Sequence, residues 1–198
     1  SGRTPAGQGG LSVAGERSAS GAGDAARLYL AGELGVTPER LSLDARGVVA
    51  GQEVRLADTA VATREADGWR LAPATLVLGQ GRVTLAGRSG ASTEASARIE
   101  ALDLGRIALF AGQNLRGLAS GEVRISLPAG GAPQGDARLM IRQVTRSGLA
   151  RSSLPADLEL VAALRGSEAA ARAFLRGQGR VLAAGQAQLT GIAPGPAA

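Results

Sequence analysis

Enzymatic chemistry in this 198-residue chain would have to rest on carboxylates, because the chain has neither His nor Cys. It therefore cannot build a Ser/His/Asp triad, a thiol nucleophile or most kinds of zinc site. Its 17 Asp and Glu residues are scattered and no spaced pair stands out, so a carboxylate hydrolase is an open but unsupported alternative. The sequence favours a protein that is not an enzyme and that requires no metal or cofactor.

This composition also argues against phosphate binding and nucleic-acid binding. All of the 22 basic residues are Arg, so a phosphate-binding loop with an invariant Lys is excluded. The arginines are scattered singly and aromatic residues make up only 2% of the chain, which argues against nucleic-acid binding. The glycines of Gly79-Gln80-Gly81 would suit a phosphate, but no helix pattern follows, and we interpret them as a hairpin corner.

Short strands are the elements that would position any site. "LSLDARG" places Leu41 and Leu43 on one face, and "EVRLAD" does the same for Val54 and Leu56. Turn residues recur every eight to fifteen positions along the chain, which leaves too little room for the helices of parallel βαβ units. These patterns predict an all-β protein with an elongated, mostly antiparallel sheet.

A few local features refine this prediction. Asp67-Gly68 is the residue pair that a tight type I′ hairpin prefers. Helical spacing predicts one short helix near 103–111, with Asp103 as its N-cap. Residues 167–177, "SEAAARAFLRG", fit either a helix or a strand, and their strand-like neighbours favour a strand.

The chain reads as one elongated β domain over residues 11–191. Residues 1–10 are expected to form a linker and residues 192–198 a flexible tail. No stretch approaches the roughly 20 apolar residues of a membrane helix, and no signal-peptide pattern is present. We expect the chain to be a part of a longer protein.

Residues 103–142 show a degenerate but recognisable arrangement. An Asp-Leu pair and a short apolar helix lead into L-x-G-x-x-S-G, an alternating strand, a Pro-containing turn and a further strand. This arrangement resembles the C-terminal conserved region of the TamB family, within the AsmA-like group. "GWRLAPATLVLGQGRVTLAG" is similar to repeats upstream in such proteins, and the likeness extends over about 40–190. The residues that carry the match are Asp103, Leu104, Leu115, Gly117, Leu118, Ser120, Gly121, Val123, Ile125, Leu127, Pro133 and Gly135.

The chain departs from the family pattern in its Ala-rich strands and in "SLPAGGAP", a longer turn than usual. The resemblance implies a sheet curled lengthwise into an open groove with an apolar inner face, the β-taco form. It implies a periplasmic location in a Gram-negative bacterium, with an inner-membrane anchor elsewhere in the parent chain. It further implies transport of phospholipid between the inner and outer membranes in support of outer-membrane biogenesis. A partner barrel of the outer-membrane-assembly type, similar to TamA, is implied for some members.

The residues that we expect to bind acyl chains are the apolar residues of the alternating strands. Because acyl chains require only a water-excluding surface, no polar recognition motif is needed. These residues are Leu41, Leu43, Val54, Leu56, Leu71, Leu76, Leu78, Val83, Leu85, Ile99, Val123, Ile125, Leu127, Leu139, Ile141, Leu158 and Leu160.

The same alternation also fits an ordinary closed core, so a second hypothesis stays open. It is a structural or adhesive β-sandwich or solenoid that binds other proteins. The two hypotheses differ in whether the apolar faces are covered or leave a large exposed patch.

Overall fold

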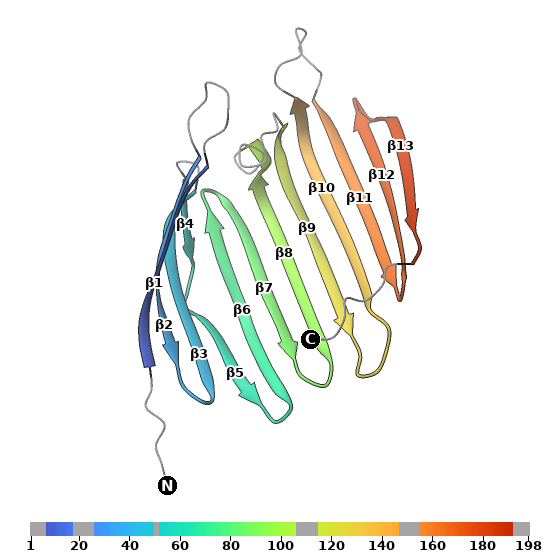
Figure 1. The fold of residues 1–198 in the computed structure, drawn as a ribbon. Helices are drawn as coiled ribbons and strands as arrows, with labels where there is room; N and C mark the ends of the chain where they lie inside the picture. Colours follow the sequence, from blue (N-terminus) through green and yellow to red (C-terminus); the bar gives the residue numbers. More distant parts are fainter. Residues whose placement is uncertain (1–6, 18–25, 50–51, 106–114, 147–154, 192–198) are drawn as a thin grey trace.

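The protein folds into one antiparallel sheet of thirteen strands, shown in Figure 1. The computed structural model describes residues 7–17, 26–49, 52–105, 115–146 and 155–191. The predicted all-β class and the elongated antiparallel sheet are confirmed. The strands are β1 (Gly7–Arg17), β2 (Ala26–Val36), β3 (Arg40–Val49), β4 (Gln52–Leu56), β5 (Ala60–Glu65), β6 (Gly68–Leu78), β7 (Gly81–Ser89), β8 (Thr93–Asp103), β9 (Leu115–Leu127), β10 (Gln134–Arg146), β11 (Ala156–Arg165), β12 (Glu168–Gly177) and β13 (Arg180–Leu189).

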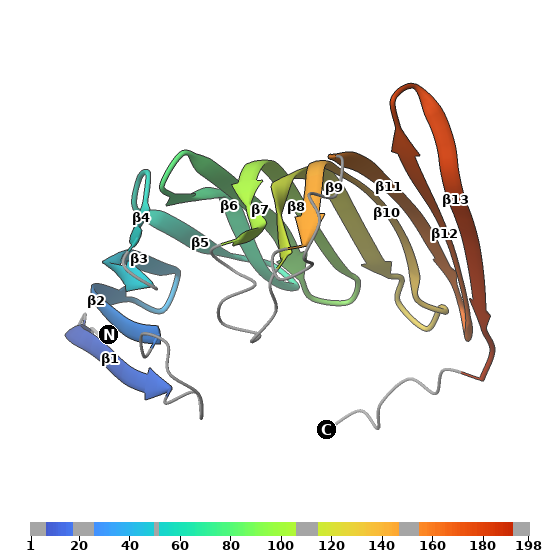
Figure 2. The ribbon, with the colours of Figure 1, turned by 90° about the horizontal axis from the view of Figure 1, so that it is seen from above.

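The strands pair almost entirely in chain order. The exception is the short pair β4 and β5, each of which pairs with both β3 and β6. Among the described strands, β1 and β13 each have a single neighbour, so the sheet does not close on itself. Seen from above in Figure 2, it forms an arch that runs from β1 to β13.

The turns lie at two ends of the sheet, which we call upper and lower as drawn in Figure 1. The lower end carries the turns at 37–39, 66–67, 90–92, 128–133 and 166–167, and the upper end those at 79–80 and 178–179. The predicted hairpin corner at Gly79-Gln80-Gly81 is confirmed, with Gly79 at a φ of 59° that suits glycine.

The hairpin between β5 and β6 differs from its prediction by one residue. Glu65 pairs with Gly68, so the two-residue loop is Ala66-Asp67 and Gly68 already belongs to β6. Neither loop residue has a positive φ, whereas a type I′ turn requires it at both positions. The predicted type I′ turn at Asp67-Gly68 is therefore wrong, although the hairpin exists.

The remaining local predictions have mixed outcomes. Residues 168–177 form strand β12, as favoured. The helix expected over 103–111 and the tail 192–198 lie largely or wholly outside the described residues. The N–H of Gly105 does donate to Oδ1 of Asp103 over 2.9 Å, as an N-cap would accept it. Gly7–Gly10, expected in a linker, are the first residues of β1.

Two β-bulges bend the middle of the sheet. Ala101 of β8 and Gln143 of β10 have φ angles of 48° and 55°, and the strand register shifts at both positions. Each bulge N–H donates to a side chain on the next strand, to Ser120 Oγ and Asp157 Oδ1 respectively, over 3.0 Å in both cases. A bulge adds a residue on one strand only, which bends that strand and increases the twist.

Glycines on the inner side of the sheet allow the backbones of neighbouring strands to approach each other closely. A Cβ on Gly81 would lie 2.9 Å from the Cα of Leu102, and one on Gly121 would lie 2.9 Å from the Cα of Leu139. Both contacts involve backbone that cannot move aside, so a larger residue would force the strands apart. The close approach of these strands therefore requires glycine at both positions.

Candidate functional site: an apolar groove

Strand register sorts the side chains onto two faces. Residues directly opposite each other in an antiparallel pair project to the same side of the sheet. One row crosses six strands from β6 to β11, and a second row runs beside it. The first row is Leu71, Gly87, Ala95, Ile125, Gly135 and Leu164, and the second is Leu76, Val83, Ile99, Gly121, Leu139 and Leu160. We call the side on which these rows lie the apolar face.

All seventeen residues predicted to line a groove lie on the apolar face. The register carries this face without interruption from β3 to β11. They are Leu41 and Leu43 on β3; Val54 and Leu56 on β4; Leu71, Leu76 and Leu78 on β6; Val83 and Leu85 on β7; Ile99 on β8; Val123, Ile125 and Leu127 on β9; Leu139 and Ile141 on β10; and Leu158 and Leu160 on β11.

The apolar face is the concave side of the arch. On a curved single sheet, side chains crowd together on the inside and spread apart on the outside. The buried hydrophobic residues of the described chain are Val54, Leu102, Ala119, Ile141 and Ala156, and the register places all of them on the apolar face. The arch in Figure 2 therefore encloses apolar side chains.

Charged side chains lie on the opposite, convex face. Among the residues of β6 to β12 whose side chains are described, the register places no Asp, Glu or Arg on the apolar face, whereas on β5 Arg64 lies on it opposite Trp69. On the convex face Arg98 pairs with Glu122 across β8 and β9 at 3.5 Å. The Glu65 carboxylate accepts a hydrogen bond from Arg70, and this raises the pKa of the Arg70 guanidinium. Exposed pairs of this kind stabilise the fold little, so their main consequence is that these charges lie away from the apolar face.

The apolar face has an upper half and a lower half, and the side chains of these halves differ in exposure. Near the upper end Val54, Ala119 and Ile141 are 4%, 1% and 7% exposed, whereas near the lower end Ile125 and Leu127 are 50% and 45% exposed. We call the buried cluster and its neighbours the packed half: Leu78, Val83, Ile99, Leu102, Leu104, Ala119, Leu139, Ile141, Val144 and Leu158. We call the exposed lower residues the open half: Leu34, Val36, Leu85, Ile125 and Leu127.

A hollow of about 680 Å³ lies beside the open half. Its lining includes five of the six residues of the first row of the apolar face, Leu71, Gly87, Ala95, Ile125 and Gly135. It also includes the charged residues Arg70, Arg88, Glu94, Arg124 and Asp136, which the register places on the convex face. Three of these five residues are Gly or Ala, so the row has few side-chain atoms to fill the space. A volume of about 300–1,000 Å³ is typical of ligand sites. Its lining combines this apolar row with charged and polar residues.

The structure adds residues to the groove that the sequence prediction missed. Leu34 and Val36 belong to the open half, and their alternation just before the Thr37-Pro38 turn was a usable signal. Leu102 and Val144 belong to the packed half, but each follows a bulge and lies three residues after the preceding inward residue. A period of two cannot be followed through a bulge.

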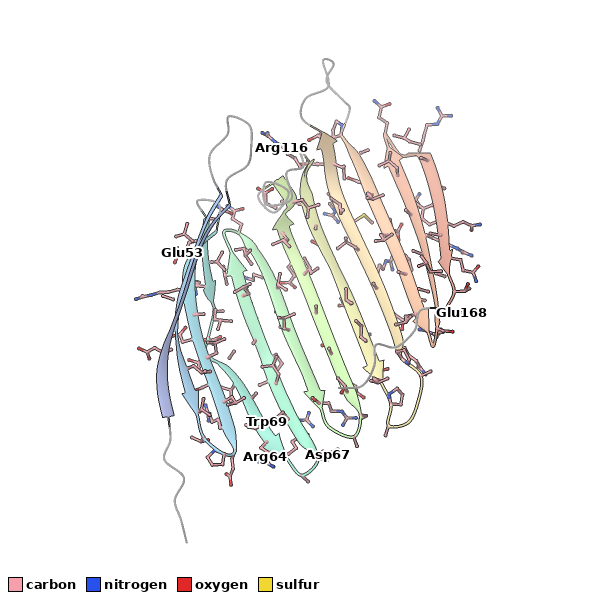
Figure 3. All side chains as sticks on the ribbon, viewed as in Figure 1. Glu53, Arg64, Asp67, Trp69, Arg116 and Glu168 are labelled. Atoms are coloured by element: carbon pink, nitrogen blue, oxygen red, sulfur yellow. The ribbon has the colours of Figure 1, made fainter. Side chains whose placement is uncertain are left out.

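The two aromatic residues whose side chains are described occupy different faces. Trp69 lies on the apolar face at the lower end of β6, opposite Arg64 and Ser89, as Figure 3 shows for Trp69 and Arg64. Phe174 lies on the convex face, where the guanidinium carbon of Arg176 is 5.9 Å from its ring centroid. Trp69 therefore contributes apolar surface at the rim of the groove, and Phe174 does not.

The described residues contain no group of three or more acidic side chains placed to hold a metal ion. Within the same ranges, no helix has the length and apolar character needed to cross a membrane. No family model matches the chain, and neither a curated protein nor a solved structure matches it.

Proposed function

We propose that this protein carries phospholipid acyl chains along its apolar groove. The observation that supports the proposal is the apolar face itself, which carries no charge among the described side chains of β6 to β12 and exposes its lower half. Water in contact with such a surface is unfavourable, and an acyl chain gains about 0.8 kcal/mol for each CH₂ that it buries. The groove offers this gain without any polar recognition group.

The two halves of the inner face have different roles in this proposal. The packed half already fills its own space, so it holds the curved sheet together. Acyl chains occupy the open half, with headgroups in water at the lower end. Because the open half extends from β2 to β9, a lipid would move across the strands rather than along them.

The cellular setting follows from the TamB resemblance and is part of the proposal. The protein would act in the periplasm of a Gram-negative bacterium, between an inner-membrane anchor in the parent chain and the outer membrane. An outer-membrane-assembly-type barrel would be its partner. The alternative of an adhesive sandwich receives less support, because no second sheet covers the apolar face within the described strands.

The test is native mass spectrometry of protein purified without detergent from bacteria, followed by organic extraction of anything bound. We expect co-purifying phospholipid, and uptake of a fluorescent acyl-chain probe from vesicles after delipidation. Protein that contains no lipid and takes up no probe would contradict the proposal and favour a protein-binding role.

Strand β9 provides a matched pair of variants. Leu127 lies on the apolar face and Leu118 on the convex face, and their exposed fractions are 45% and 44%. We expect Leu127→Arg to lose lipid and Leu118→Arg to retain it, with both variants keeping the far-UV circular dichroism of a β protein. Equal lipid loss in both variants would show that the groove is not where lipid binds.

A further inference from the structure

One arginine lies on the apolar face, at the lower end of the groove (Figure 3). Among the strand residues of β3 to β12 whose side chains are described, Arg64 is the one charged residue that the register places on this face. It is exposed, and its guanidinium has no hydrogen bond, ion pair or ring contact with the described part of the chain, Asp67 of the adjoining turn included. The neighbouring Glu65 lies on the convex face and pairs with Arg70 there. The charge of Arg64 is therefore available to a ligand.

Arg64 belongs to the last row of the apolar face before the lower turns. Trp69 lies directly opposite Arg64, and Ser89 lies opposite Trp69 on the next strand. Ser89 and Thr93 flank the turn at 90–92; both are exposed, and neither hydroxyl has a partner among the described residues. On β9 the row continues with the apolar Leu127, opposite Thr93. We call Arg64, Trp69, Ser89 and Thr93 the polar corner, which is confined to β5–β8.

The row immediately above the polar corner is apolar. It consists of Ala62, Leu71, Gly87 and Ala95 on the same four strands, and Ile125 continues it on β9. Two residues along a strand span about 6.8 Å, so only that distance separates the polar corner from a row that can contact acyl chains. A Trp side chain, with an apolar body and one N–H donor, suits such a boundary. The two rows together match the junction between the headgroup and the acyl chains of a lipid.

We propose that the polar corner holds the phosphate of a lipid headgroup, with Arg64 as the residue that binds it. A guanidinium can donate two parallel N–H bonds to phosphate oxygens. The hydroxyls of Ser89 and Thr93, two and three strands away, can donate to other headgroup oxygens. This role rests on the proposed function, because acyl chains in the open half bring the headgroup to the corner. It adds a preference for a phosphate-bearing lipid over an uncharged lipid with the same acyl chains.

The test compares the binding of two short-chain fluorescent lipids to delipidated protein in solution. One is a phosphatidylglycerol and the other is the diacylglycerol with the same acyl chains. We expect the wild-type chain to bind the phosphatidylglycerol about fivefold more tightly, the upper end for an exposed charge pair, and the preference to shrink at high salt. Arg64→Gln should remove the preference and leave diacylglycerol binding unchanged. The control Arg40→Gln, which removes an exposed charge from the convex face at the lower end of β3, should keep it.

The possible failures of this test are distinguishable. Equal binding of both lipids by the wild-type chain, a preference that survives Arg64→Gln, or one that Arg40→Gln also removes would each overturn the headgroup role and leave acyl-chain binding intact. Inorganic phosphate at the concentration of the lipid should not displace the phosphatidylglycerol, and displacement would show that the corner binds a free anion instead. A folded wild-type chain that binds neither lipid would contradict the proposed function itself. Circular dichroism confirms that each variant is folded.

Discussion

Two isoleucines on the apolar face test whether its halves have different roles. Ile141 lies in the packed half and is 7% exposed, whereas Ile125 lies in the open half and is 50% exposed. Replacing either by Ala removes three carbons from the same face of adjacent strands. The two variants therefore differ chiefly in burial.

The structure gives the expected magnitudes. At about 0.8 kcal/mol per buried carbon, Ile141→Ala loses about 2.4 kcal/mol of transfer free energy. The cavity that it leaves beside Leu102 and Ala119 adds to this, for a total of about 3–4 kcal/mol. At Ile125, half-exposed before substitution, the loss in the free energy of unfolding is about 1 kcal/mol.

Urea unfolding of delipidated protein, followed by circular dichroism, measures the stability of each variant. Uptake of an acyl-chain probe by folded protein measures binding. We expect Ile141→Ala to be the less stable variant and Ile125→Ala the weaker binder. Equal destabilisation by both substitutions would refute the division into packed and open halves, and unchanged probe uptake by Ile125→Ala would remove the open half from the binding surface.

Three further predictions concern the backbone and the convex face. Gly121→Val should abolish folding or cost more than about 3 kcal/mol, because its Cβ meets the backbone of β10, whereas Gly185→Ala, with nothing within 4 Å, should be nearly neutral; soluble yield and urea midpoints decide this. Asp157→Ala should lower the free energy of unfolding by about 1 kcal/mol, since it removes the acceptor of the Gln143 N–H, and an unchanged urea midpoint would show that the bulge does not need it. Glu122→Ala should change the free energy of unfolding by less than about 1 kcal/mol at low or high salt, and a larger, salt-sensitive loss would contradict the minor role given to the convex ion pairs.

Much of the groove could be predicted from the sequence, because alternation with period two assigns side chains to faces locally. The seventeen residues predicted to bind acyl chains were chosen in this way, and the register places all of them on one face. The prediction missed residues where the face of a side chain depends on contacts with another strand. Leu102 and Val144 follow bulges at Ala101 and Gln143, whose positive φ angles are held by contacts with the next strand.

The sequence by itself determined the β class, the antiparallel order and the composition of the apolar face. Only the tertiary structure decided that the sheet bends into an arch, that its upper half packs on itself and that its lower half stays exposed. Ile125 and Ile141 have the same side chain and lie on the same face, yet they differ in exposure by a factor of about seven. Exposure depends on which side chains of other strands pack around a residue, and the alternation along any one strand does not contain that information.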